Sequence, residues 1–335
     1  MKRFTVCAVL TASLLSGAPA AAEIGHFVPG LLNIRDYFVP PESGVYAVAY
    51  NYFYSTDRRN DEDGDKIRSL LVNPGPGPGV TLGLDVDLDL YALVVPIIWV
   101  SEWKVLGARY GAIAAPIFAN ASIEAGLSVG NRFGGDADNA SFAVADPFIQ
   151  PIWLDWGGKH YEVAAAYGFY PAAGKYDTNP LFGSVRVEDA DNIGFGFWTH
   201  QGQLAAAWYP FESRGTAVTG VATYEYHSEK DDFDLTPGEN VTLNWGISQF
   251  IPLRSDHKLL LEIGPAGWNG WQLEEDEGTD ALDTHKDQTH AAGGQLGVTY
   301  LPSFLAVNFH GFYEYDTRSR FQGFSLGLSI ARKFF

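Results

Sequence analysis

The chain has 335 residues, of which 46% are apolar, and its 40 acidic side chains outnumber 22 basic ones to give a formal net charge of −18. The apolar fraction is high enough for a packed fold and excludes a disordered chain. The negative charge excludes nucleic acid as a main partner, because proteins that bind phosphate backbones concentrate Lys and Arg on one face.

The first 22 residues are typical of a secretory signal peptide. Two basic residues at 2–3 precede an apolar stretch at 4–15, and three alanines at 20–22 offer a cleavage site of small residues. The single cysteine, Cys7, would be removed with this segment. We therefore expect a mature chain without disulfides, thiolate catalysis or cysteine-bound metal, and the sequence implies no cofactor.

Beyond the signal the sequence predicts β-strands. No run of about 18 apolar residues remains for a spanning helix, whereas repeated alternation, 14% aromatic residues and 37 glycines favour strands. We expect twelve strands, at 45–55, 80–100, 103–119, 142–155, 160–170, 193–209, 215–228, 239–251, 257–272, 288–301, 304–316 and 321–335.

The connections between these strands alternate in length. Long, mostly acidic ones such as 120–141 follow the odd-numbered strands, and short turns such as Ser101 and Glu102 follow the even-numbered ones. This asymmetry is typical of bacterial outer-membrane barrels, whose closed sheet pairs every backbone polar group within lipid. We predict an all-β, transmembrane, antiparallel up-and-down β-barrel of about 12 strands at 45–335, in the outer membrane of a Gram-negative bacterium.

The predicted strand at 80–100 has two different faces. Leu84, Leu88 and the other even-numbered positions around them are apolar, whereas Asp85, Asp87 and Asp89 share the opposite face. Because a carboxylate in hydrocarbon is costly, we expect the leucines to face lipid and the aspartates to face the lumen.

This row of aspartates allows two interpretations. Like charges repel unless water or a basic group stabilises them. The row is either a water-facing wall near the outer rim or a partner for Arg35 or for the pair Arg318 and Arg320. The sequence leaves both open.

The last predicted strand shows the clearest alternation. Phe324, Leu326, Leu328 and Ile330 oppose small residues, as expected of a strand that faces lipid on one side. The chain ends on an aromatic residue, Phe335, which makes the barrel-assembly machinery an expected partner of the C-terminal strand. Tyr50 and Tyr52, near the end of the first strand, are expected at a membrane interface.

Residues 23–44 precede the first strand and are predicted to enter the lumen as a plug. The segment carries apolar side chains that a periplasmic tail would expose to water, and that tail is the alternative. Five prolines lie within predicted strands, where each should force a bulge or kink: Pro96, Pro116, Pro147, Pro151 and Pro265. Such kinks would either adjust the local twist or open a gap in the wall.

The mature sequence resembles the outer-membrane proteins called "involved in the MetA pathway of phenol degradation". The matching positions include 25–30, Asn33, Arg35, Asp36, 171–176, Glu314, Arg318, Arg320 and Gly323. The resemblance implies a transporter for aromatic or other hydrophobic compounds, without catalytic residues. The candidate lumen and plug residues are then Asn33, Arg35, Asp36, Asp85, Asp87, Asp89, Glu314, Arg318 and Arg320.

We therefore expect a channel for passive uptake of small hydrophobic or aromatic compounds, with outer-membrane lipid and lipopolysaccharide as its surroundings. One alternative is a hydrolase at the barrel rim, because 126–130 and 323–327 match the Gly-x-Ser-x-Gly pattern. Neither match precedes a helical pattern, which that motif requires. The other alternative is a structural or adhesive barrel whose lumen is filled by side chains.

Overall fold

The computed structural model describes residues 25–72, 80–129, 132–182, 185–189, 191–281 and 285–335. The predicted signal peptide at 1–22 lies outside them. The described chain consists of β-strands and one short 3-10 helix. In chain order the elements are β1 (Gly44–Thr56), β2 (Ser69–Val72), β3 (Val80–Val94), β4 (Ile97–Val105), β5 (Ala108–Ala115), β6 (Ile117–Val129), β7 (Arg132–Val144), β8 (Phe148–Gly157), β9 (Tyr161–Tyr170), β10 (Thr178–Phe182), β11 (Val185–Glu188), β12 (Thr199–Trp208), β13 (Thr216–His227), β14 (Asn240–Pro252), β15 (Leu259–Gln272), β16 (Gln288–Tyr300), the 3-10 helix η1 (Leu301–Ser303), β17 (Leu305–Arg318) and β18 (Phe324–Lys333). Within the described ranges no helix is long and apolar enough to span a membrane.

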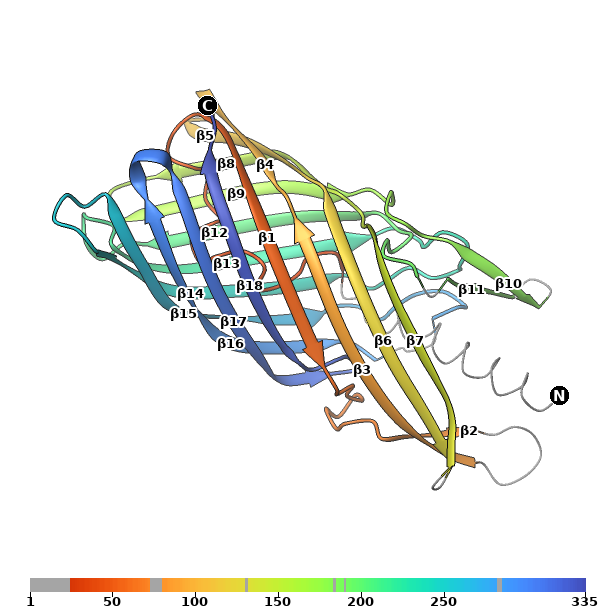
Figure 1. Cartoon of the computed structure of the whole chain (residues 1–335). Helices are drawn as coiled ribbons and strands as arrows, with labels where there is room; N and C mark the ends of the chain where they lie inside the picture. The colour runs from red at the N-terminus through yellow and green to blue at the C-terminus, as the bar shows by residue number, and fades with distance from the viewer. Residues whose placement is uncertain (1–24, 73–79, 130–131, 183–184, 190, 282–284) are drawn as a thin grey trace.

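Six of these elements are halves of longer strands. β1 pairs with both β3 and β4, and β5 and β7 lead directly into β6 and β8. With each pair counted once, the main sheet is an antiparallel barrel of 12 strands that closes where β18 pairs with β1 (Figure 1). The predicted fold class is confirmed.

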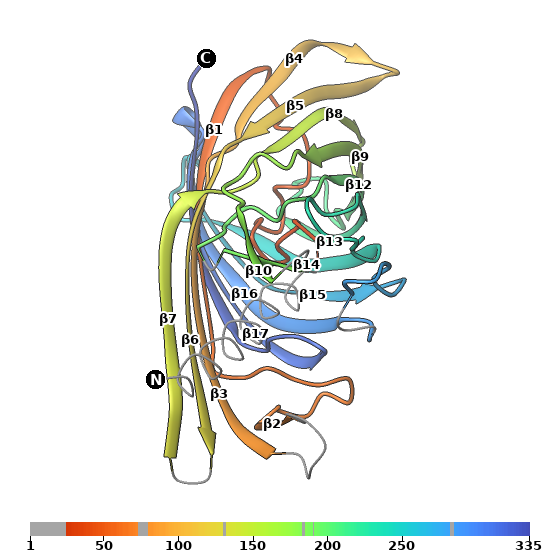
Figure 2. The same ribbon diagram turned by 90° about the vertical axis from the view of Figure 1, so that its right-hand side faces the viewer.

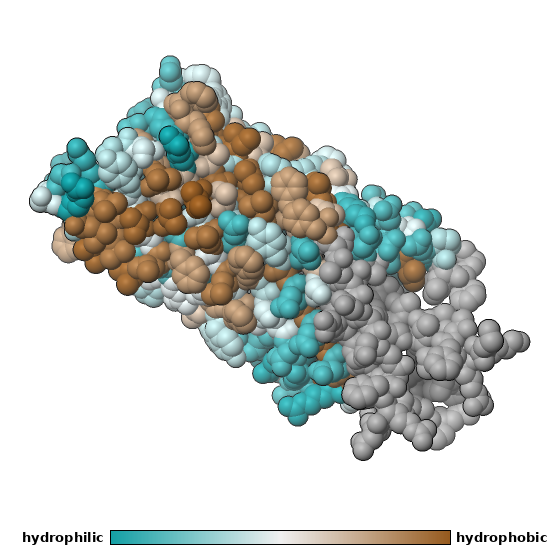
Figure 3. Space-filling view, viewed as in Figure 1, coloured by the Kyte–Doolittle hydropathy of each residue, from teal (hydrophilic) through white to brown (hydrophobic). Residues whose placement is uncertain are grey.

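The outer surface of the barrel is apolar. In β18, Phe324, Leu326, Leu328 and Ile330 are between 38% and 47% exposed, whereas Ser325 is only 2% exposed. Figure 3 shows apolar side chains over the middle of the barrel and hydrophilic ones toward its ends. The alternation predicted for the last strand is therefore confirmed, and this face matches what lipid requires.

The inner surface differs between two parts of the wall. From β12 to β18 the buried inward side chains are largely polar and include Thr199, Gln201, Thr223, Glu225, Asn240, Thr242, Asn244, Glu262, Thr289, Gln295, Asn308, Glu314 and Ser329. From β1 to β6 they are largely apolar and include Tyr46, Val48, Tyr50, Tyr52, Ala92, Val94, Ile98, Val100, Ala115 and Ala119. We call these two parts the polar wall and the apolar wall.

Three neighbouring strands of the wall are interrupted by prolines. The breaks lie at Pro96 between β3 and β4, at Pro116 between β5 and β6, and at Pro147 between β7 and β8. Each proline lacks the amide that would donate to the ladder. β8 pairs with β5 and β9, but β7 pairs only with β6 among the described strands. On its other edge, β7 makes one backbone hydrogen bond to the described residues, from the Lys175 N–H to the Val144 C=O (2.9 Å).

The remaining two strand prolines also disturb pairing, as predicted. The register of β8 against β9 shifts between Ile149 and Ile152, on either side of Pro151. In β15, Pro265 has a partner in β16 but none in β14.

Two predicted boundaries are wrong. Ser101 and Glu102 lie inside β4, and the hairpin turns at Leu106 and Gly107, which have φ of 52° and 80° as the tight primed turns require. Residues 120–141, predicted as a loop, are mostly strand, because β6 and β7 project beyond the rim (Figure 2). A strand that leaves the bilayer needs no apolar outward residues, so its sequence resembles a loop.

Candidate functional site

The segment before β1, residues 25–43, lies inside the barrel (Figure 2). It begins beside the ends of β9, β12 and β13, and crosses the lumen to Gly44. At Gly30 the backbone has a φ of +76° and runs so close to Trp268 that a Cβ would lie 2.4 Å from the indole ring. Only glycine fits such an approach without strain.

Arg35 fastens this segment to the polar wall. Its Nε donates to Ser248 Oγ (2.8 Å) and to Glu262 Oε1 (3.0 Å). Its two terminal nitrogens donate to the C=O groups of Arg214 and Gly215 at 3.0 and 2.8 Å. The guanidinium is thus satisfied on every nitrogen, as a buried cation must be. Of the interpretations that the sequence left open, the pairing of Arg35 with the row of aspartates is excluded, because its partner is Glu262.

Backbone groups of the segment also bind the polar wall. The N–H groups of His26 and Phe27 donate to Glu225 Oε1 at 3.1 and 2.9 Å. The Ile34 N–H donates to Gln295 Oε1 at 2.8 Å. Side chains that face the lumen therefore supply the acceptors that an irregular buried backbone needs.

Asn33 and Asp36 form a compact group in the middle of the segment. Asn33 Nδ2 donates to Asp36 Oδ2 (2.5 Å) and to Ser329 Oγ (2.9 Å). Tyr50 of β1 donates its hydroxyl to the same oxygen of Asp36 at 2.6 Å. Burial raises the pKa of Asp36 above its ordinary value, and the bonds from Tyr50 and Asn33 oppose that rise.

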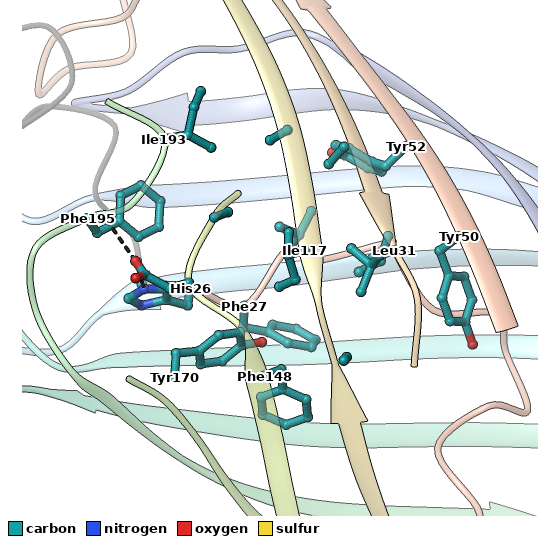
Figure 4. A pocket seen from close by; sticks show the side chains of 18 of the residues that line it. His26, Phe27, Leu31, Tyr50, Tyr52, Ile117, Phe148, Tyr170, Ile193 and Phe195 are labelled. Carbon is teal, nitrogen blue, oxygen red and sulfur yellow. Dashed lines mark hydrogen bonds and ion pairs between the residues drawn. The ribbon is translucent and has the colours of Figure 1, made fainter. Parts of the chain in front are cut away.

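A cavity of about 430 Å³ separates this segment from the apolar wall (Figure 4). It is lined mainly by apolar and aromatic side chains, among them Phe27, Leu31, Tyr52, Leu88, Leu90, Ala92, Val94, Ile117, Ala119, Phe148 and Tyr170. Pro96, Ala145 and Asp146, at the interrupted level of the wall, also line it. Its volume lies in the range of small-molecule sites, and an apolar cavity of about 150 Å³ already admits benzene.

Asp146 joins four parts of the chain at one end of this cavity. Its Oδ1 accepts the N–H groups of Ala173 and Gly174, each at 2.7 Å. Its Oδ2 accepts the Phe195 N–H (2.8 Å) and His26 Nε2 (3.0 Å). The carboxylate therefore holds the stretch after β9 and the start of the lumen segment against the break before β8.

His26 is held from several sides. Its Nδ1 lies 2.6 Å from Thr199 Oγ1, and its ring stacks on Tyr170 at 4.7 Å with the edge of Phe195 at 4.6 Å (Figure 4). Burial lowers the pKa of His26, although the Asp146 carboxylate favours the protonated form. A neutral imidazole accounts for both bonds, because Nε2–H donates to Asp146 while Nδ1 accepts from Thr199.

Comparison with known proteins agrees with this architecture. The family model described as "Putative MetA-pathway of phenol degradation" matches residues 56–330. The chain belongs to this family. The resemblance inferred from the sequence is therefore confirmed, and the protein is an outer-membrane β-barrel of a Gram-negative bacterium.

Several solved structures are similar to this chain at low sequence identity. The COG4313 outer membrane channel from Pseudomonas putida F1 is 16% identical with a TM-score of 0.63, over 90% of this chain and 100% of that one. The beta domain of the Bordetella autotransporter BrkA is 10% identical with a TM-score of 0.48, over 88% and 100%. The CymD monoaromatic hydrocarbon channel is 10% identical with a TM-score of 0.37, over 92% and 95%. No curated protein matches by sequence.

The row of aspartates faces outward, which corrects the predicted orientation of the strand at 80–100. Leu88 lines the cavity, whereas Asp85, Asp87 and Asp89 are exposed. β1 ends at Thr56, opposite Leu88, so β3 continues beyond the rim of its neighbour. Asp85 and Asp87 lie beyond that end, and Asp89 lies opposite Ser55. Because an exposed carboxylate is costly in hydrocarbon, this level of the strand is expected in water outside the bilayer.

Glu314 belongs to the polar wall near the outer rim. Its Oε2 accepts the Tyr54 hydroxyl and the Gly323 N–H, both at 2.8 Å. Arg318 is exposed beside Asp316 at 3.9 Å, and the C=O of Arg320 accepts the Asn60 N–H at 2.9 Å. Arg318 thus pairs with Asp316, and not with the row of aspartates as one of the open interpretations had it.

Sequence reasoning missed His26 and Asp146, and it misplaced Tyr50 and Tyr52. Both tyrosines are at most 5% exposed and line the cavity instead of lying at a membrane interface. One signal could have pointed to Asp146, since it directly precedes the strand-breaking Pro147. Nothing in the sequence connects it to His26, which lies 120 positions away.

The described residues support neither alternative function, the hydrolase at the barrel rim or the structural barrel. The side chain of Ser128 lies outside the described residues, and no described histidine hydrogen-bonds Ser325, which is 2% exposed in the lumen. In the part of the chain that the structure describes, no group of three His, Cys, Asp or Glu side chains could hold a metal ion. The cavity is also unlike the filled lumen that a purely structural barrel predicts.

Proposed function

We propose that the protein is a channel for passive uptake of small hydrophobic or aromatic molecules, and that these molecules pass through the cavity beside the apolar wall. The observation that carries this proposal is the position of the cavity. It lies against the interrupted level of the barrel, where Pro96 and Asp146 line it. Transfer of a molecule from water to such a cavity gains about 0.8 kcal/mol per buried CH₂, so no energy source is needed for entry.

The proposed route starts outside the barrel. Leu88 and Leu90 lie where the projecting part of β3 joins the barrel, opposite Thr56 and Tyr54 of β1, and both line the cavity. A hydrophobic molecule would move past these leucines, occupy the cavity, and leave sideways into the membrane at the interrupted level of the wall beside Pro96. Such an exit suits a molecule that prefers lipid to water.

The lumen segment has the complementary role of a plug. Its cation and its backbone donors bind the polar wall through Glu262, Gln295 and Glu225. The segment thereby occupies the half of the lumen that water and polar solutes would otherwise use. Polar solutes are excluded while the apolar side stays open.

A tryptophan in the cavity tests the proposal. Ala119 is 7% exposed and lines the cavity, so Ala119→Trp should fill part of it. We expect uptake of 1-naphthol into liposomes containing the protein to fall at least severalfold. Leu328→Trp on the lipid face is the matched control and should leave uptake unchanged. Equal uptake by both variants and the wild type would contradict a route through this cavity.

A further inference from the structure

We propose that the cavity selects small aromatic molecules that carry a hydrogen-bond donor, a hydroxyl or an amino group, and that Asp36 binds this donor. This inference rests on the proposed function, because it names the chemistry of the molecules that the same cavity would take.

The hydrogen bonds that the Asp36 carboxyl accepts all end on one of its two oxygens. Tyr50 Oη (2.6 Å), Asn33 Nδ2 (2.5 Å) and the Asn33 backbone nitrogen (3.3 Å) all donate to Oδ2. Oδ1 accepts no bond from the described residues, and it is not among the polar atoms that are shut off without a partner. Asp36 lines the cavity and is partly exposed. One carboxyl oxygen is thus held by the protein and the other remains available to a molecule in the cavity.

Among the residues that the structure describes, no Lys or Arg side chain bonds to the Asp36 carboxyl. The neighbouring Arg35 reaches in another direction, to Glu262 and the turn at Arg214. The cavity around Asp36 is lined by Leu32, Val94 and other apolar side chains. A carboxyl oxygen in such a place gains more from a donor than it would in water, since few water molecules compete for it.

The same geometry discriminates between ligands. A hydrocarbon would cover Oδ1 without satisfying it, and sites built to bind a hydroxyl reject analogues that lack it for this reason. An anion would be repelled by Asp36 and by Asp189 and Asp191, which also line the cavity. A neutral donor on an aromatic ring satisfies the oxygen and leaves the ring to the apolar and aromatic lining.

The test compares p-cresol with p-xylene, which differ by a hydroxyl in place of a methyl group. Binding to the purified full-length protein in detergent is followed by fluorescence of Trp153, which lines the cavity, and by calorimetry. The wild type should bind p-cresol more tightly. Asp36→Leu should weaken the binding of p-cresol by about tenfold or more. It should leave the affinity for p-xylene unchanged or raise it.

Tyr50→Phe is the matched control. It removes a donor from Oδ2 but leaves the Asp36 carboxyl in place, so the preference for p-cresol should persist. Asp36→Asn serves if Asp36→Leu does not form a heat-modifiable barrel on a gel. The asparagine amide has the size of the carboxyl but lacks its charge. The affinity for p-cresol should therefore fall, whereas the affinity for p-xylene should not.

The outcomes separate this inference from the proposed function. If p-cresol and p-xylene both bind the wild type and the Asp36 variants change neither, or change both equally, Asp36 is not the selective group while the channel proposal stands. If neither compound binds the wild type at saturating concentration, the cavity is not a ligand site and the proposed function fails with it.

Discussion

The polar and apolar walls of this barrel belong to one sheet but treat the lumen segment differently. The polar wall, β12 to β18, is regular and offers side-chain acceptors such as Glu225, Glu262 and Gln295 to the segment. The apolar wall, β1 to β6, is interrupted at Pro96 and Pro116; it packs against apolar side chains of the segment such as Tyr37 and Val39, and it also borders the cavity. The comparison shows that polar inward side chains fasten the segment by hydrogen bonds, whereas the cavity borders the apolar ones.

The physical reason lies in the backbone of the segment. An irregular chain carries N–H and C=O groups that must be paired when they are buried. The polar wall can pair them, and the apolar wall mostly cannot. The cavity therefore borders the side where few polar groups bind the segment and where the barrel is also interrupted.

The largest effect should follow from removal of the segment. Deletion of residues 23–41 with the signal retained leaves β1 intact and empties the polar half of the lumen. We expect a folded, heat-modifiable barrel whose single-channel conductance in planar bilayers rises severalfold and whose selectivity against polar solutes falls. If the deletion leaves conductance unchanged, the segment does not restrict the lumen.

The next largest effect concerns the buried ion pair that fastens the segment. Arg35→Met leaves Glu262 without its cation, and loss of one partner of a buried pair costs about 3–5 kcal/mol. The segment should detach more often, which would be seen as frequent opening events in bilayer recordings. Arg35→Met combined with Glu262→Gln should restore part of the closed state, because no unpaired charge then remains.

The third prediction compares two leucines on different faces. Leu328 is 39% exposed on the lipid face, so Leu328→Arg should destabilise the barrel by about 2–4 kcal/mol in urea titrations in lipid vesicles. Leu84 lies beyond the end of β1, so Leu84→Arg should lower the free energy of unfolding by much less than Leu328→Arg does. The triple change of Asp85, Asp87 and Asp89 to Asn should leave assembly unaffected. A block of assembly by the triple variant would show that the aspartates do not face water outside the barrel.

The smallest effect concerns pH. The pKa of His26 is lowered in the folded protein from its ordinary value of 6.5, so the neutral form is the one that the fold favours. The stability that the buried, neutral His26 contributes is therefore complete above about pH 6.5 and declines as the pH falls below that value, because a protonated ring cannot accept the hydrogen bond from Thr199. We expect more opening events at pH 5 than at pH 7.5. His26→Asn should show less of this pH dependence, and a full dependence in that variant would exclude His26 as its origin.

Local alternation explains why the fold could be predicted from the sequence. The spacing of Phe324, Leu326 and Leu328 fixes which face of the last strand meets lipid, and no distant residue changes that result. The strand prolines could likewise be recognised as breaks, because a missing amide is a property of the residue itself.

The orientation of the aspartates and the contacts that were missed depend on how distant parts of the chain meet. Asp85 faces outward without contacting lipid only because β1 stops at Thr56, and the sequence of β3 carries no record of that. The contact of His26 with Asp146 requires the lumen segment, the break before β8 and the stretch after β9 to meet. The sequence identified Asp36 as a candidate residue. It could not show that the hydrogen bonds end on Oδ2 and leave Oδ1 available, because this depends on the folded positions of Asn33 and Tyr50.

The central claim is that apolar ligands occupy the space beside the apolar wall while the segment fills the polar half. Crystals of the protein soaked with 4-bromophenol test it most directly, because anomalous scattering locates the bromine atom. The account predicts bromine density in the cavity bounded by Tyr52, Ile117 and Phe148. Density only beside the polar wall, or none in the lumen at a saturating concentration, would contradict it.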